Sequence, residues 1–117
     1  MNATAQPAGR HPASGPDYQP VGDLRRLQLE RLKAMLQRAY EDVAPYRRRL
    51  EDWGITPDHV RSLDDIVKLP FMKKSDLHDT YPFGLFASPL EEIVRLHASS
   101  GTTGKPIVVA YTREDLD

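Results

Sequence analysis

The chain has 117 residues, the size of one ordinary domain or of part of one. Its 16 basic and 17 acidic residues give a net charge of −1, so we expect neither nucleic acid nor a membrane as a partner. There is no cysteine, which excludes disulfides and thiolate chemistry and fits a cytoplasmic protein. The first residues lack the pattern of a signal peptide, and no apolar run approaches membrane-spanning length. The histidines lack zinc-like spacing, so we expect no metal site: His11, His59, His78 and His97.

Residues 1–22 are rich in proline and poor in apolar side chains, and we interpret them as a disordered arm. A first helix is predicted to begin at Asp23, a good N-cap, and to run to about Ala44. Its apolar stripe has helical spacing: Leu29, Leu32, Leu36, Tyr40 and Val43. The sequence therefore predicts an amphipathic helix that needs a packing partner.

A second short helix is predicted from Pro45 to a stop at Gly54. The basic run Arg47–Arg49 inside it has two interpretations, a nucleic-acid patch or a solvated helix face. Acidic residues follow at once and no aromatic residues interleave with the run, which favours the solvated face.

Further helix-start patterns follow at Thr56-Pro57, at Ser62 and at Ser75, and the last of these helices must end before Pro82. The aromatic stretch from Tyr81 to Phe86 is predicted to be an extended plug that packs on the helices or on a missing neighbour. Residues 23–88 are thus expected to form a mainly helical subdomain.

From Pro89 the pattern becomes strand-like. Residues 92–98 and 106–111 are rich in β-branched and aromatic side chains, which predicts a β-hairpin. Thr112, followed by Asp115, is typical of a helix start, and the chain stops soon after it. We therefore expect residues 89–117 to be the start of a larger α/β domain that has been cut.

The loop between the two strands is rich in hydroxyls and glycine. Its glycines allow backbone N–H groups to face an anion, and its hydroxyls and one ammonium add further donors. Glycine, serine and threonine are also ordinary turn residues, so a plain hairpin turn is the alternative. The pattern favours a phosphate site, formed by Ser99, Ser100, Gly101, Thr102, Thr103, Gly104 and Lys105.

Two common nucleotide-binding motifs do not fit this loop. In a P-loop aligned on Gly104-Lys105, Ser99 occupies the place of the first glycine and Pro106 the place of the magnesium-binding hydroxyl, and a strand follows where a helix is required. No Gly-x-Gly-x-x-Gly pattern exists either, which excludes a dinucleotide fingerprint.

The loop instead resembles the phosphate-binding signature of the adenylate-forming enzymes, the acyl- and aryl-CoA synthetases. Neighbouring stretches, in this order, resemble the beginning of the phenylacetate–CoA ligases: Leu27-Gln28-Leu29-Glu30-Arg31-Leu32, Ala44-Pro45-Tyr46-Arg47, Tyr81-Pro82-Phe83-Gly84-Leu85-Phe86 and His97-Ala98-Ser99-Ser100-Gly101-Thr102-Thr103-Gly104-Lys105-Pro106. The resemblance extends from about residue 23 to residue 117. In many members of the superfamily a lysine follows the proline, whereas here Lys105 precedes Pro106.

The resemblance implies a parent enzyme that uses ATP, Mg²⁺ and coenzyme A to convert an aryl acid, phenylacetate, into an aryl-adenylate and then into a thioester. The loop would hold the β- and γ-phosphates of ATP. Lys105 would add a cation or lie on the surface, and His97 would approach a ligand or be packed. The resemblance places no catalytic residue in this chain, which is expected to be inactive alone.

Two alternatives remain open at this point. The helical region 23–80 could be a non-catalytic interaction or dimerisation module, since apolar stripes left exposed favour self-association. The parent could also be a ligase for another aryl acid such as benzoate, because nothing in these residues fixes the acid.

Overall fold

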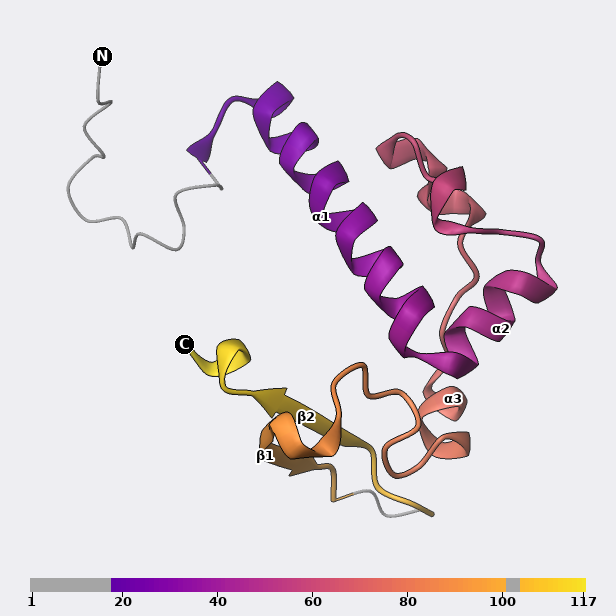
Figure 1. Cartoon of the computed structure of the whole chain (residues 1–117), viewed down its shortest axis with the longest axis vertical. Coiled ribbons are helices and arrows are strands. Elements are labelled where there is room, and N and C mark those ends of the chain that lie inside the picture. The colour runs from indigo at the N-terminus through magenta and orange to yellow at the C-terminus, as the bar shows by residue number, and fades with distance from the viewer. Residues whose placement is uncertain (1–17, 101–103) are drawn as a thin grey trace.

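The computed structural model describes residues 18–100 and 104–117, and Figure 1 shows their arrangement. A long helix α1 leads into shorter helical elements, and the chain then forms a two-stranded hairpin, β1 and β2. The predicted order, a mainly helical part followed by a β-hairpin, is confirmed. The division into an arm (1–22), a helical subdomain (23–88) and the start of a larger domain (89–117) stays a prediction, and residues 1–17 of the arm lie outside the described residues.

Helix α1 spans Val21–Asp42, so the predicted start at Asp23 and end near Ala44 are each wrong by two residues. Pro20 precedes the helix with φ −53°, and its carbonyl accepts the N–H of Leu24 at 2.9 Å. Asp23 therefore lies in the first turn, where an acidic side chain meets the positive end of the helix dipole, and it pairs with Arg26.

Helix α2 spans Ala44–Asp52, so it begins one residue before the predicted start at Pro45, and its predicted stop before Gly54 is confirmed. Gly54 has a φ of +67°, which glycine adopts without the steric cost that a Cβ would bring. The N–H of Gly54 bonds the carbonyl of Glu51 at 2.9 Å, and the N–H of Ile55 bonds that of Leu50 at 2.9 Å. These two bonds form a Schellman motif, which turns Ile55 back toward the core.

The hydrophobic core joins α1, α2 and the segment that follows them. Leu36, Leu50 and Val60 are buried in contact with one another. Half-buried apolar side chains surround them: Leu29, Leu32, Tyr40, Tyr46, Ile55 and Leu69. The stripe that the helical spacing predicts on α1 is thus the side that packs.

Two short 3₁₀ helices follow α2, at Pro57–His59 and Leu63–Lys68, as the start patterns predict. In the second, Asp65 Oδ2 accepts the backbone N–H groups of Arg61 at 2.8 Å and Ser62 at 2.9 Å, and its Oδ1 lies 2.7 Å from the ammonium of Lys68. The ammonium, followed by the two N–H groups, holds the pKa of Asp65 well below its usual range. This carboxylate therefore fixes the entry into the helix.

Helix α3, Lys74–Asp79, is tied to α2 by an ion pair. Arg49 donates two hydrogen bonds to the carboxylate of Asp76, at 2.9 and 2.6 Å, and a third to the carbonyl of Phe71 at 2.9 Å. Asp76 also accepts the N–H of Lys73 at 2.6 Å, so α3 begins one residue before the predicted start at Ser75. The guanidinium of Arg49, followed by that N–H, holds the pKa of Asp76 well below its usual range.

The basic run on α2 is only partly a solvated face, so that interpretation is wrong for two of its members. Arg49 makes the ion pair described above, and Arg47 donates to the carbonyls of Tyr40 at 3.3 Å and Glu41 at 3.1 Å. Arg48 alone of the three is exposed. Arginine carries fixed donors that can satisfy the free carbonyls at a helix end, which the charge pattern alone does not reveal.

The hairpin pairs β1, Ile93–Ala98, with β2, Val108–Thr112, in antiparallel register, with His97 opposite Val109 and an irregularity between Ile93 and Arg95. Half-exposed apolar side chains lie on both strands: Val94, Leu96 and Val109. After β2, Thr112 and Asp115 bond each other reciprocally at the start of a 3₁₀ helix, Glu114–Leu116, which confirms the predicted helix start.

The core predicts that the same substitution, valine to alanine, changes the free energy of unfolding by different amounts at two positions. Val60 is fully buried, whereas Val67 is 83% exposed. We expect Val60→Ala to lower the free energy of unfolding by about 1.5–3 kcal/mol, because it removes buried methyl groups and leaves a cavity. Val67→Ala should change it by less than about 0.5 kcal/mol. Urea unfolding followed by circular dichroism measures both, and equal losses would contradict the core described here.

The ion pair between α2 and α3 predicts a pH dependence. The pKa of Asp76 is lower in the folded chain than in an unfolded chain, where it is about 3.9. The ionised carboxylate therefore contributes fully to the free energy of unfolding above about pH 3.9, and this contribution is lost as the pH falls through the folded pKa. We therefore expect Asp76→Asn to lower the urea midpoint at pH 7, and the gap from the wild type to narrow at pH 3.

The matched control for that experiment is Asp79→Asn, which changes an exposed carboxylate on the same helix. It should leave the midpoint close to the wild-type value at pH 7. A gap between wild type and Asp76→Asn that stays constant from pH 7 to pH 3 would contradict the role of the charge.

Candidate phosphate-binding site

The predicted phosphate loop connects β1 and β2, and hydrogen bonds close its base. The N–H of Ser99 donates to the carbonyl of Ile107 at 2.9 Å, and the N–H of Ile107 donates to Ser99 Oγ at 2.9 Å. Gly104 has a φ of +90°, a conformation that favours glycine. Gly101, Thr102 and Thr103 lie outside the described residues. The two described ends of the loop are thus held together by hydrogen bonds.

The structure brings four predicted site residues to these two ends, and all four are exposed: Ser99, Ser100, Gly104 and Lys105. The hydroxyl of Ser99 accepts one hydrogen bond, but a hydroxyl still has a proton to donate. The ends therefore present the hydroxyl groups of two serines and one ammonium. All of these donate, which suits an anion such as a phosphate.

Lys105 has an aromatic partner that the sequence pattern does not reveal. Its ammonium lies over the ring of Tyr81, with Nζ 5.8 Å from the ring centroid. Both residues belong to stretches that resemble the same family, but nothing in their spacing brings them together. Lys105 is exposed, in agreement with a surface position, and its contact with a phosphate stays a prediction.

The segment that carries Tyr81 is a compact turn, so the predicted extended plug is wrong. The N–H of Gly84 bonds the carbonyl of Thr80 at 2.8 Å, and the N–H of Phe86 bonds that of Phe83 at 3.0 Å. A Cβ at position 84 would lie 2.7 Å from Thr80 O, so only glycine fits without a shift of backbone. The rings of Phe83 and Phe86 pack at 5.2 Å between centroids. The glycine and these local bonds fold the segment back on itself.

His97 lies on β1, two residues before the loop. Its ring meets that of Tyr111 edge to face, with 5.2 Å between centroids. The antiparallel register places the two on diagonal positions of one sheet face, where aromatic side chains reach each other. This contact gives His97 a packing partner, and its approach to a ligand stays a prediction.

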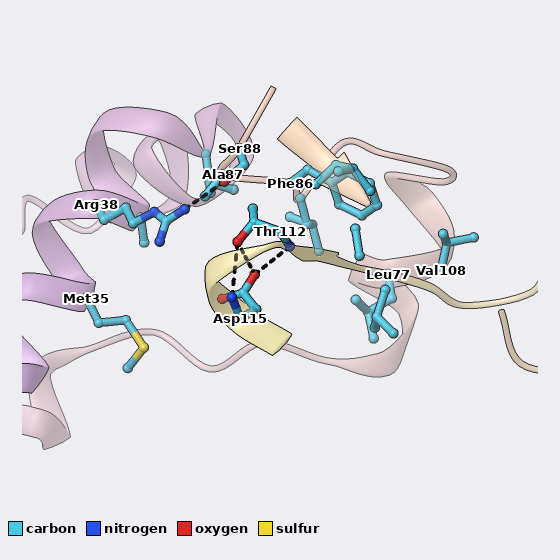
Figure 2. Close-up of a pocket in the computed structure, with 15 residues that line it drawn as sticks. Met35, Arg38, Leu77, Phe86, Ala87, Ser88, Val108, Thr112 and Asp115 are labelled. Atoms are coloured by element: carbon cyan, nitrogen blue, oxygen red, sulfur yellow. Dashed lines mark hydrogen bonds between the residues drawn. The ribbon is translucent and has the colours of Figure 1, made fainter. Parts of the chain in front are cut away.

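The structure also contains a hollow of about 400 Å³ between α1, residues 85–88 and β2, shown in Figure 2. Its lining is mostly apolar, and Met35, Leu77, Phe86 and Val108 belong to it. The polar groups drawn there bond one another, because Arg38 donates to Ser88 at 2.7 Å and Thr112 pairs with Asp115.

The N–H of Thr112, followed by its hydroxyl, lowers the pKa of Asp115. A ligand site usually combines apolar walls with a few polar groups that can reach the ligand. Since the polar groups of this hollow are already paired, its chemistry is that of a packing surface, and the loop remains the better candidate site.

Two further features concern the described part of the chain. Among residues 18–100 and 104–117, no group of three or more histidines and carboxylates is placed to hold a metal ion. Nor is any helix in these ranges long and apolar enough to span a bilayer.

Comparison with known sequences gives consistent matches. The chain is 57% identical over 97 residues to the phenylacetate-coenzyme A ligase of Thermus thermophilus and 56% identical over 95 residues to that of Aromatoleum evansii. The Escherichia coli enzyme of the same name is 54% identical over 97 residues. These matches cover 81–83% of this chain but only 22% of each relative. No family model matches the chain.

Solved structures give the same class of enzyme. A crystal structure of 2-hydroxyisobutyryl-CoA ligase in complex with 2-HIB-AMP and CoA matches with a TM-score of 0.77 and 34% identity. Another structure of that ligase, in its postadenylation state with 2-HIB-AMP, matches with a TM-score of 0.74. The first match covers 83% of this chain and 22% of the solved chain. The fold described here is therefore also found as a part of a much longer CoA ligase.

Proposed function

Because the chain is homologous to a segment of the phenylacetate-coenzyme A ligases, we propose that it supplies the ATP-phosphate site of a ligase that joins an aryl acid, phenylacetate, to coenzyme A. The observation that carries the proposal is identity of 54–57% to four such ligases along more than four fifths of the chain. The donor-rich loop that closes the hairpin gives this similarity a chemical basis.

The reaction proceeds in two transfers. In the first, a carboxylate oxygen of the acid attacks the α-phosphorus of ATP, the bond from that phosphorus to the bridging oxygen breaks, and pyrophosphate leaves. In the second, the sulfur of coenzyme A attacks the acyl carbon, its proton is lost, and AMP leaves. The proposal assigns this chain the first transfer only, as a part of the site that holds the leaving phosphates.

The loop serves this step by position and charge. Ser99, Ser100, Thr102 and Thr103, with backbone N–H groups near Gly101 and Gly104, hold the β- and γ-phosphates, and Lys105 adds a cation. Donors fixed before the reaction stabilise charge that develops on the leaving pyrophosphate, and they orient the α-phosphorus toward the acid.

The described residues do not form a metal site of their own. Mg²⁺ usually keeps several waters and binds proteins through one or two carboxylates together with substrate phosphates. We propose that Mg²⁺ enters the site as a complex with ATP, bound to the phosphate oxygens.

The parent enzyme is proposed to be longer than this chain, because the ligases that it resembles are each covered to only 22%. Residues 89–117 would begin the nucleotide-binding domain, and residues 23–88 would form a helical subdomain before it. The acid pocket and the residues that complete catalysis would lie elsewhere in the parent. The chain alone is then expected to be inactive.

The phosphate site is tested by titrating the ¹⁵N-labelled chain with a non-hydrolysable ATP analogue and Mg²⁺. We expect the amide signals of Ser99, Ser100, Gly104 and Lys105 to shift. Ser100→Ala should weaken binding about tenfold, because a hydrogen bond to a charged group is worth about 1.5 kcal/mol or more. The matched control Ser75→Ala changes an exposed serine on α3 and should bind as the wild type does. Unchanged loop signals would favour a non-catalytic module.

A chimera tests whether this chain can serve as part of such a ligase. The segment of the Thermus thermophilus ligase that corresponds to this chain is replaced by residues 21–117, and phenylacetate-dependent exchange of pyrophosphate into ATP is measured. We expect exchange in the chimera and none with the 117-residue chain alone. No exchange in the chimera, or pyrophosphate release by the chain alone, would contradict the proposal.

A further inference from the structure

The position of Lys105 leaves its charge available. Its Nζ lies 5.8 Å from the centroid of the Tyr81 ring, within the range of about 6 Å at which a cation and an aromatic face attract each other. The ion pairs between described residues join Arg25 to Asp64, Arg26 to Asp23, Arg49 to Asp76 and Lys68 to Asp65, and Lys105 belongs to none of them. A carboxylate partner would compensate the positive charge of the ammonium, whereas an aromatic ring restricts its position and leaves the charge uncompensated.

Tyr81 is itself fixed by the helical part of the chain. Its N–H donates to the carbonyl of His78 at 3.2 Å, and the hydroxyl of the preceding Thr80 donates to the carbonyl of Asp76 at 2.6 Å. The carboxylate of Asp76 is held in turn by Arg49 on α2. A continuous set of contacts therefore runs from α2 through α3 to the ring of Tyr81, over which the Lys105 ammonium lies.

We propose that Tyr81 is a positioning residue, whose ring holds the Lys105 ammonium at the end of the loop in reach of the phosphate groups that the loop binds. The inference rests on the proposed function, because it assigns a residue outside the loop to that same site. On this inference, the ammonium of Lys105 lies on the surface when no ligand is bound and is held there for the anion.

The strength of the contact fits such a role. A cation over a ring at an exposed site changes an equilibrium by a factor of about two to five. A hydrogen-bonded pair of an ammonium and a phosphate is stronger, because both partners carry charge. The ring can thus restrict where the ammonium lies without competing with an incoming phosphate.

The test compares Tyr81→Leu with the conservative variant Tyr81→Phe, which keeps a ring. In the wild type, the ring current of Tyr81 should shift the ε-methylene protons of Lys105 upfield in the NMR spectrum. Tyr81→Phe should keep that shift, and Tyr81→Leu should lose it. Unchanged amide signals of Leu50 and Val60 in the core show that each variant is folded.

Binding is measured with inorganic tripolyphosphate as the probe. We expect Tyr81→Leu to weaken binding about two- to fivefold and Tyr81→Phe to bind as the wild type does. In a Lys105→Met background, Tyr81→Leu should have no further effect, because the ring acts only through the ammonium. A structural role for Tyr81 would weaken binding equally in both backgrounds.

Three results overturn the inference: no ring-current shift at Lys105 in the wild type, wild-type binding by Tyr81→Leu, or an equal loss with and without Lys105. A fourth concerns the proposed function. If the wild-type chain shows the ring-current shift but does not bind tripolyphosphate, the phosphate site fails, and the positioning role fails with it although the contact between Tyr81 and Lys105 is real.

Discussion

The bidentate ion pair between Arg49 and Asp76 is the contact on which the positions of α3 and of the turn after it depend. It joins α2, which belongs to the core, to α3, which does not contribute a buried apolar residue. Arg49 also bonds the carbonyl of Phe71, so one guanidinium fixes both the chain entering α3 and the helix itself. The turn that follows α3 takes its position from this pair. The position of the Tyr81 ring, over which the Lys105 ammonium lies, therefore depends on an arginine far from it in sequence.

The hairpin has the opposite character, because little in the described chain covers it. A two-stranded sheet alone is marginally stable in water, and Val94, Leu96 and Val109 remain about half exposed. The hollow beside β2 is lined by apolar side chains whose polar neighbours are paired. Such a surface gains stability by burial. The relatives that this chain matches are covered to only 22%, so they contain further elements that this chain does not.

Much of the fold could be predicted from local sequence. The spacing of Leu29, Leu32 and Leu36 gave the packed side of α1, and Pro45 and Gly54 marked the two ends of α2. These features are local, because a helix face, a proline and a glycine act through their own backbone. The closed base of the loop followed in the same way from two β-rich stretches around a turn.

What the sequence did not reveal depends on contacts between distant residues. Arg49 reads as one charge in a basic run, and only its distance to Asp76 shows that it is structural. The turn at residues 81–85 depends on the close approach of Gly84 to Thr80. The aromatic-rich sequence does not indicate this approach, because the same sequence also suits an extended segment. The contact of Lys105 with Tyr81 likewise joins two segments that are distant in sequence, and their spacing does not reveal it.

The order Gly104-Lys105-Pro106 has a structural consequence for the site. Gly104 takes a φ of +90°, and a proline at 106 disfavours a helical backbone at Lys105, so the chain is restricted on both sides of the lysine. Ile107, the residue after the proline, is bonded to Ser99 through its backbone N–H and its carbonyl. A lysine placed after the proline would occupy position 107, whose backbone is already paired with Ser99. Before the proline, the lysine stays in the loop, where its ammonium meets the Tyr81 ring and keeps its charge.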